Sequence, residues 1–294
     1  MQNLLYYKYV KIKDPESFRD KHLAFCKKIG LLGKVLVAKE GINGCVSGTE
    51  EQCKQYIIEL RKDPSFADIE FKITATDNHN FKKMFVRIRN EIVTTKVLSI
   101  HLKDKAPYIE PREFKQLLES GEEIVVIDAR NDYESDIGKF KNAITPDIKI
   151  FSEWPEAVKK LKYLKDKPIV TYCTGGIRCE KASAYLKEQG FKNVRQLHGG
   201  IIRYGEECGN SHWQGKCFVF DNRGAINIDP SAPSEPITQC NLCRLPCDDY
   251  YNCALFTCDK RFIACSTCIK ALEGCCSKRC RNEVGKKVIT HAEA

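Results

Sequence analysis

The sequence predicts two consecutive domains of mixed α and β structure, followed by a small cysteine-rich module. The chain of 294 residues is long enough for two average domains, and helix-like and strand-like segments alternate along most of it. Ten of its 17 cysteines lie between Cys240 and Cys280. We therefore expect four divisions: a first domain over 1–97, a second over 98–228, a linker over 229–239, and the cysteine-rich module with its tail over 240–294.

The composition is that of a folded globular protein, with 43% hydrophobic and 30% charged residues. No apolar run exceeds four residues, which excludes a helix crossing a membrane, and Met1–Lys13 lacks the apolar core of a secretory leader. We therefore expect a cytoplasmic protein. In a reducing compartment, cysteines are metal ligands, nucleophiles or core residues more often than disulfides.

The first domain is predicted from hydrophobic periodicity. Strand patterns cover residues 4–12, 35–38, 44–47 and 69–74, and helix patterns cover 15–29 and 50–62. The order strand, helix, strand, strand, helix, strand is typical of a ferredoxin-like α+β domain. We expect the two glycines of segment 40–44 to permit a tight backbone between the two middle strands.

Positive charge is concentrated in this first domain. Its 18 basic and 12 acidic residues give +6, whereas 19 and 18 give +1 for residues 98–215, and 11 and 9 give +2 beyond. Cations are interleaved with apolar side chains over residues 81–89. If this stretch is a strand, one face carries aromatic and cationic side chains together, as in sheets that bind single-stranded nucleic acid: Phe81, Lys83, Phe85, Arg87 and Arg89. An ordinary solvated edge strand is the alternative interpretation. The candidate RNA contacts are Lys82, Lys83, Arg87 and Arg89.

The second domain is predicted to be an α/β domain with a parallel sheet. A short helix ends near Leu117, strands cover 124–127 and 168–172, and helices cover 152–165 and 178–189, with Ser152 as the expected N-cap of the first of these. Strands that alternate with helices favour a parallel sheet whose ligands bind at the carboxyl ends of the strands.

The loop after the second of these strands contains the candidate catalytic residue, Cys173. Glycines next to a helix N-terminus bring several backbone N–H groups together, and the helix dipole favours a thiolate over a thiol. A buried packing cysteine is the alternative, but it would need neither two glycines nor an arginine. The expected cradle for an anionic sulfur consists of Thr174, Gly175, Gly176, Ile177 and Arg178.

This loop, together with the segments 128–130 and 197–201, resembles a rhodanese domain. Rhodaneses are sulfurtransferases whose loop cysteine can carry a persulfide. Phosphatases with related loops have five residues between cysteine and arginine, whereas four separate Cys173 from Arg178, which favours sulfur chemistry. The resemblance implies a supporting role for Asp128 and Arg130.

Over nearly its whole length the chain resembles the bacterial tRNA uridine hydroxylases, through the segments 39–44, 130–134, 173–179 and 215–221. The resemblance implies an acylphosphatase-like first domain and the oxygen-dependent conversion of the wobble uridine of tRNA to 5-hydroxyuridine. It also implies that Cys173 is the active, persulfide-bearing residue. A tRNA anticodon arm as partner would explain the positive charge of the first domain, because lysines and arginines bind phosphates.

The sequence is compatible with two alternative functions. One is a persulfide or thiosulfate sulfurtransferase that delivers sulfur to an acceptor protein, and the other is a non-catalytic RNA-binding adaptor that senses redox state. A sulfur or electron donor protein is a further candidate partner. Cys179 lies six residues after Cys173, so it either resolves a persulfide or sulfenate on Cys173 or packs within the first helical turn.

The cysteine-rich module is predicted to bind metal. Cys240 and Cys243 form one C-x2-C pair and Cys265 and Cys268 another, a spacing typical of a four-thiolate zinc site. An iron–sulfur cluster is the alternative. The module is too short to fold on an apolar core alone, so metal would stabilise it. The ligands of a second site are sought among Cys247, Cys253, Cys258, Cys275, Cys276 and Cys280.

Overall fold

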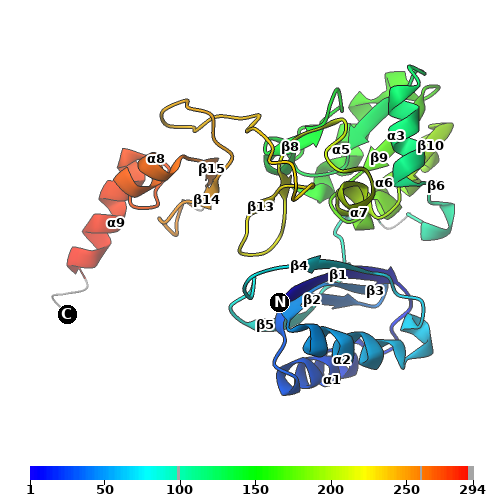
Figure 1. Ribbon diagram of the computed structural model, residues 1–294, viewed down its shortest axis with the longest axis horizontal. Coiled ribbons are helices and arrows are strands. Elements are labelled where there is room, and N and C mark those ends of the chain that lie inside the picture. The colour runs from blue at the N-terminus through cyan, green and yellow to red at the C-terminus, as the bar shows by residue number, and fades with distance from the viewer. Residues whose placement is uncertain (98–99, 259, 291–294) are drawn as a thin grey trace.

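The computed structural model describes residues 1–97, 100–258 and 260–290 (Figure 1). Within this part of the chain, every helix is too short or too polar to cross a membrane. The boundary expected between residues 97 and 98 falls at positions 98 and 99, which lie outside the described residues. The last four residues of the expected tail lie outside them as well.

The first domain is a sheet with helices on one side. Its strand order is β4-β1-β3-β2-β5; all neighbours are antiparallel except β2 and β5, so the predicted α+β class is confirmed. The elements are β1 (Gln2–Tyr9), α1 (Pro15–Lys28), β2 (Leu32–Ala38), β3 (Gly41–Gly48), α2 (Glu50–Arg61), the 3-10 helix η1 (Pro64–Phe66), β4 (Phe71–Ala75) and β5 (Met84–Ile88).

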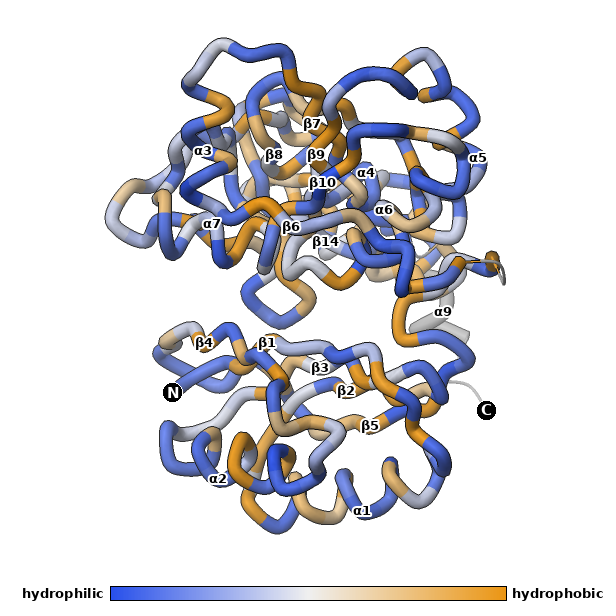
Figure 2. Tube along the Cα trace, turned by 90° about the vertical axis from the view of Figure 1, so that its right-hand side faces the viewer, coloured by the Kyte–Doolittle hydropathy of each residue, from blue (hydrophilic) through white to orange (hydrophobic). Residues whose placement is uncertain are grey.

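The two faces of this sheet have different roles. Leu4 and Tyr6 alternate along β1 with Asn3, Leu5 and Tyr7, so the first set packs in the core with the helices and the second lies on the opposite face. Helices α1 and α2 lie on the side away from the second domain, and the sheet itself faces that domain (Figure 2). We call this second surface the open face.

The backbone is tight at both glycines as expected, but the connection between β2 and β3 is shorter than predicted. The chain reverses at Lys39 and Glu40, and β3 already begins at Gly41. The glycines serve close packing within the sheet: a Cβ on Gly41 would lie 2.1 Å from the Lys8 carbonyl oxygen, and one on Gly44 would lie 2.2 Å from the Tyr6 hydroxyl.

The second domain has a four-stranded sheet in the order β6-β10-β9-β7, and all its pairs are parallel, as predicted. Helices pack around it (Figure 1). Its elements are η2 (Leu102–Asp104), β6 (Tyr108–Ile109), α3 (Pro111–Glu119), β7 (Val125–Asp128), α4 (Asp132–Ser135), β8 (Gly138–Phe140), η3 (Phe151–Glu153), α5 (Trp154–Lys160), η4 (Lys162–Leu164), β9 (Pro168–Tyr172), α6 (Ile177–Glu188), β10 (Asn193–Leu197), α7 (Gly200–Cys208) and β11 (Trp213–Gly215).

The helix predicted from Ser152 to Lys165 is shorter and begins later. Ser152 lies inside η3, and α5 starts at Trp154 with Glu153 as its N-cap. Pro155 explains the start, because proline has no N–H to donate and is favoured in the first helical positions.

The cysteine-rich module contains little regular structure: β12 (Cys217–Phe218) and β13 (Ala225–Ile226) precede it, and β14 (Tyr250–Asn252), β15 (Arg261–Ile263), α8 (Ser266–Ala271) and α9 (Lys278–Thr290) form it. Its cysteines share a core with Ile137 and Phe218 of the second domain. Part of the expected tail is helical, since α9 extends to Thr290.

Candidate active site and metal centres

Cys173 lies directly after β9, at the start of the loop that leads into α6. The Gly176 N–H donates to the Cys173 sulfur at 3.2 Å, and Gly176 has a φ of +100°, which only glycine adopts readily. Gly200 packs under the loop, where a Cβ would lie 2.4 Å from the Cys173 carbonyl oxygen. These glycines allow the backbone to close around the sulfur.

The surroundings of Cys173 favour the thiolate. Complete burial by itself opposes ionisation, but the Cys179 thiol, the Arg178 charge and the N–H groups of both residues stabilise the anion and lower the Cys173 pKa to about 6. Cys173 is therefore largely ionised at neutral pH. A lowered pKa makes the thiolate, which is the nucleophilic form of cysteine, available at neutral pH.

Arg178 is held by a buried carboxylate. Its Nη2 lies 2.8 Å from Oε2 of Glu134, its Nη1 binds the other carboxylate oxygen, and Nη2 also donates to Oγ1 of Thr174 at 3.3 Å. Glu134 is fully buried and comes from α4. The pair fixes the guanidinium beside the sulfur, and sequence analysis did not identify Glu134 as its partner.

Cys179 neighbours Cys173 and has a different protonation state. Burial and the neighbouring Cys173 raise its pKa well above the ordinary value, so it keeps its proton. Cys179 is completely buried in the first turn of α6. Its position beside Cys173 is compatible with either role considered for it.

Asp128 and Arg130 form a buried ion pair beside the strand that leads to Cys173. Their side chains are fully buried with a shortest distance of 2.6 Å, and the Tyr172 hydroxyl donates to Asp128 at 2.7 Å. Arg130 also donates to the Gly138 carbonyl at 2.6 Å. These bonds tie together the ends of β7, β8 and β9, and Tyr172 directly precedes Cys173.

A cavity of about 290 Å³ lies between the loop and the open face of the first domain. That volume is near the lower end of the range for small-ligand sites, and the lining is mainly apolar. From the second domain the lining includes Cys173, Thr174, Gly175, Ile177 and Arg178. From the open face it includes Asn3, Leu5, Tyr7, Leu36, Asn43 and Cys45.

The cavity also holds a few buried polar groups that sequence analysis missed. Asp221 accepts from Asn3 Nδ2 at 3.1 Å and from Arg223 Nη2 at 2.6 Å. Asn3 is 2% exposed, and its Oδ1 has no hydrogen-bond partner among the described residues. An apolar pocket with a few fixed polar groups is the usual form of a small-ligand site.

The two domains are tied together around this cavity. Lys181 of α6, whose side chain is 5% exposed, reaches Glu40 at 2.9 Å and Glu91 at 2.7 Å. The Tyr7 hydroxyl donates to Glu180 at 3.0 Å. Glu40 belongs to the segment 39–44, so part of that motif positions the first domain over the Cys173 loop.

The candidate RNA contacts lie in β5 and directly before and after it, on one edge of the sheet. Phe85 and Arg87 project from the open face as the alternation predicts, and the Arg87 guanidinium lies 4.9 Å from the centre of the Phe85 ring. Lys82, Lys83 and Arg89 are exposed around them. Lys34 on the adjacent β2 lines the cavity, and burial together with Arg87 and Arg89 lowers its pKa.

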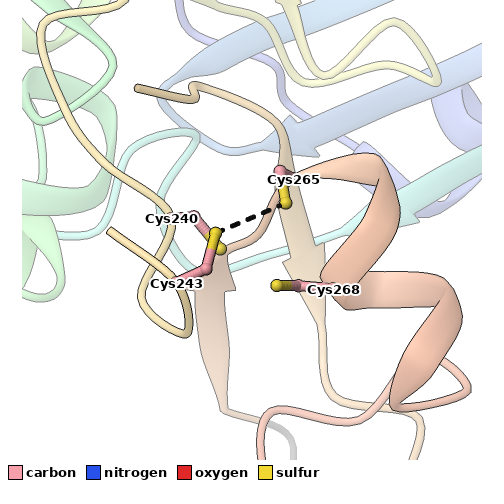
Figure 3. A group of neighbouring side chains, drawn as sticks. All are labelled: Cys240, Cys243, Cys265 and Cys268. Atoms are coloured by element: carbon pink, nitrogen blue, oxygen red, sulfur yellow. Dashed lines mark hydrogen bonds between the residues drawn. The ribbon is translucent and has the colours of Figure 1, made fainter. Parts of the chain in front are cut away.

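The first predicted metal site is brought together by the fold. The sulfurs of Cys240, Cys243, Cys265 and Cys268 all lie within 4.8 Å of one another (Figure 3). Those of Cys243 and Cys265 are 3.7 Å apart. Four thiolates at 2.3 Å from a tetrahedral ion would be about 3.8 Å apart, so the set fits one ion of zinc size.

The structure selects the second ligand set, which the spacing left open. It consists of Cys253, Cys258, Cys276 and Cys280, with sulfur distances of 3.8 Å for Cys258 and Cys276 and 3.7 Å for Cys276 and Cys280. Cys247 and Cys275 remain outside both sets. Four sulfurs this close suit one ion better than a four-iron cluster, where each thiolate binds a separate iron.

Family models match three consecutive parts of the chain. A UPF0176 acylphosphatase like domain matches residues 1–92, a Rhodanese-like domain matches 110–207, and a Rhodanase C-terminal region matches 214–281. The predicted rhodanese and acylphosphatase-like domains are therefore confirmed.

Curated relatives match almost the whole chain. A tRNA uridine(34) hydroxylase of Cytophaga hutchinsonii is 44% identical over 281 residues, covering 95% of this chain and 89% of that protein. Proteins of the same name from Bacillus licheniformis and Listeria welshimeri are 48% and 47% identical, over 88% and 95% of this chain and 82% and 89% of their own lengths.

Proposed function

Since the chain belongs to the tRNA uridine(34) hydroxylase family, we propose that it converts the wobble uridine of tRNA to 5-hydroxyuridine. The observation that best supports this reaction is the cavity between the domains, which has a stabilised thiolate on one side and a strand face with a basic edge on the other. The cavity suits one base, and the basic edge suits the phosphates beside it.

We assign the central chemical role to Cys173, as thiolate or as persulfide. Placing one atom of molecular oxygen on the base and reducing the other to water takes two electrons and two protons. A separate donor, a protein or a thiol, would supply them. Arg178 would keep the sulfur anionic, and the apolar walls would exclude bulk water from it.

We propose that the anticodon arm crosses the open face, with the target base turned out of its stack toward Cys173. Enzymes that modify a base must remove it from the stack to reach it, and the loop of an anticodon arm is single-stranded. Lys82, Lys83, Arg87 and Arg89 would contact phosphates on the β5 side.

We propose zinc as the metal in both four-cysteine sites, with a structural role. Burial raises the pKa of Cys240, but the N–H groups of Cys243, Cys265 and Leu242 overcome this effect and hold it at about 6, so the sulfur is ready to bind a cation. Each set contributes four cysteines and leaves no position for a substrate, as in structural zinc sites.

Nucleoside analysis of tRNA from a strain lacking this gene tests the proposed reaction. We expect 5-hydroxyuridine and its derivatives at the wobble position to disappear and to return with the wild-type gene. Unchanged hydroxylation would overturn the proposal. Persulfide turnover by purified protein without RNA would then favour a sulfurtransferase, and full function of a Cys173→Ala variant would favour an adaptor.

A further inference from the structure

A second, larger cavity lies at the seam between the two domains. Its volume is about 590 Å³, and Tyr7 lines both this cavity and the one at Cys173. The strand order places it at the β4 edge of the sheet, opposite the β5 edge that carries Arg87. Its lining includes Lys72 and Tyr7 of the first domain and Lys103, Tyr108 and His198 of the second.

The charges around this cavity leave two lysines without acidic partners. Lys8 pairs with Asp68, Lys105 pairs with Glu180, and Glu70 lies within 4.0 Å of both His198 and Arg203. Lys72 and Lys103 form no ion pair with any described residue. Both lysines therefore lie more than 4.0 Å from every carboxylate of the described chain, and Glu70 and Glu206 act on Lys72 only from beyond that distance.

Lys72 has the surroundings of an anion-binding group. Its ammonium lies 5.5 Å from the centre of the Tyr7 ring, and it forms no side-chain hydrogen bond within the described residues. Burial lowers the pKa of Lys72, which means that the charged form is poorly solvated there. An arriving anion would compensate for that loss of solvation more than at an open surface.

Aromatic rings line the same cavity. Tyr108 and His198 are in contact, with ring centres 4.6 Å apart, and Tyr108 is 39% exposed. Aromatic rings next to cations are the usual combination in sites that hold single-stranded nucleic acid, because bases stack on the rings while phosphates meet the charges.

We propose that this cavity binds the nucleotide next to the target uridine, with its phosphate on Lys72 and its base against Tyr108 and His198. The shared wall at Tyr7 places the two cavities side by side, as consecutive nucleotides of one strand require. The RNA would then contact cations at both edges of the sheet, with the target base between them. This inference rests on the proposed function.

Binding of an anticodon stem-loop to the full-length Lys72→Gln variant tests the subsite without relying on hydroxylation. We expect affinity to fall roughly tenfold and the slope of log K against log salt to become shallower by about one, because one phosphate contact is lost. Lys160→Gln is the matched control, since Lys160 is exposed, unpaired in the described chain and distant in the fold. Thermal unfolding of both variants checks that they are folded.

Stem-loops with one neutral methylphosphonate identify the phosphate. We expect a single position, directly before or after the target uridine, to weaken wild-type binding while leaving the Lys72→Gln variant unaffected. Equal binding by Lys72→Gln and Lys160→Gln would overturn the subsite, as would a uniform effect of every methylphosphonate. If the stem-loop binds as expected but is never hydroxylated, the proposed reaction fails and the subsite stands.

Discussion

The cysteine-rich module and the Cys173 loop use the same side chain in opposite ways. In the module, eight cysteines form two sets of four, and the sulfurs of each set all lie within 4.8 Å of one another. In the loop, one sulfur is stabilised by N–H groups, a neighbouring thiol and an arginine. Cysteines grouped in fours can hold a cation that stabilises a fold, whereas a single ionised cysteine can act as a nucleophile.

Removing one metal ligand should have the largest effect on the molecule. In Cys253→Ser we expect bound zinc to fall from two ions per chain to one and the module to unfold locally, because structural zinc contributes on the order of 10 kcal/mol to such folds. Elemental analysis and protease sensitivity measure both effects. Cys247→Ser is the control: it should keep two ions, and a loss of metal there would contradict the ligand assignment.

Breaking the buried pair beside Cys173 should have the next largest effect. Glu134→Gln leaves the Arg178 guanidinium buried without a carboxylate, and we expect the free energy of unfolding to fall by about 3–5 kcal/mol. Urea denaturation measures it. Glu156→Gln removes an exposed partner of Lys159 and should cost under about 1 kcal/mol. Equal losses in the two variants would show that the buried pair has no special structural role.

The pH dependence of activity should report the Cys173 thiolate. A group with a lowered pKa ionises as the pH rises through that value, so activity limited by the thiolate should increase through about pH 6 and then level off. In the double variant Glu134→Gln/Arg178→Gln the cation is gone, and the inflection should move to higher pH. Single-turnover rates across the pH range measure it, and an unmoved inflection would remove Arg178 from this role.

The smallest of these effects is expected at the β5 edge. Arg87→Gln removes an exposed cation that stacks on Phe85, and we expect stem-loop affinity to fall about threefold to tenfold, with a shallower salt slope. Arg112→Gln, on an exposed part of α3, should leave binding nearly unchanged. Identical binding by the two variants would indicate that the RNA does not cross this edge.

Much of this fold is predictable because the signals are local. Alternation and helical periodicity predicted most strands and helices, and β9 matches its predicted bounds of Pro168 to Tyr172. The glycines and the arginine after Cys173 likewise belong to one short segment. The C-x2-C pairs predicted the first metal site for the same reason, because two short spacings already define four ligands.

The rest depends on contacts between distant segments. Glu134 meets Arg178 across 44 positions, and nothing near either residue indicates the other. The contact of Leu5 and Tyr7 with the second domain was not predicted, because a face that covers a neighbouring domain has the same alternating pattern as one that faces water. The second set of four cysteines could be identified only from the fold, since the six remaining cysteines admit several combinations of four ligands.

We propose that Cys173 performs the chemistry while the module cysteines maintain structure. The decisive measurement is wobble 5-hydroxyuridine in tRNA from the deletion strain complemented with Cys173→Ala at wild-type protein levels. We expect no modified nucleoside above the level of the deletion strain, although the variant remains folded, keeps its metal and still binds the anticodon stem-loop. Wild-type amounts of 5-hydroxyuridine in that strain would contradict it.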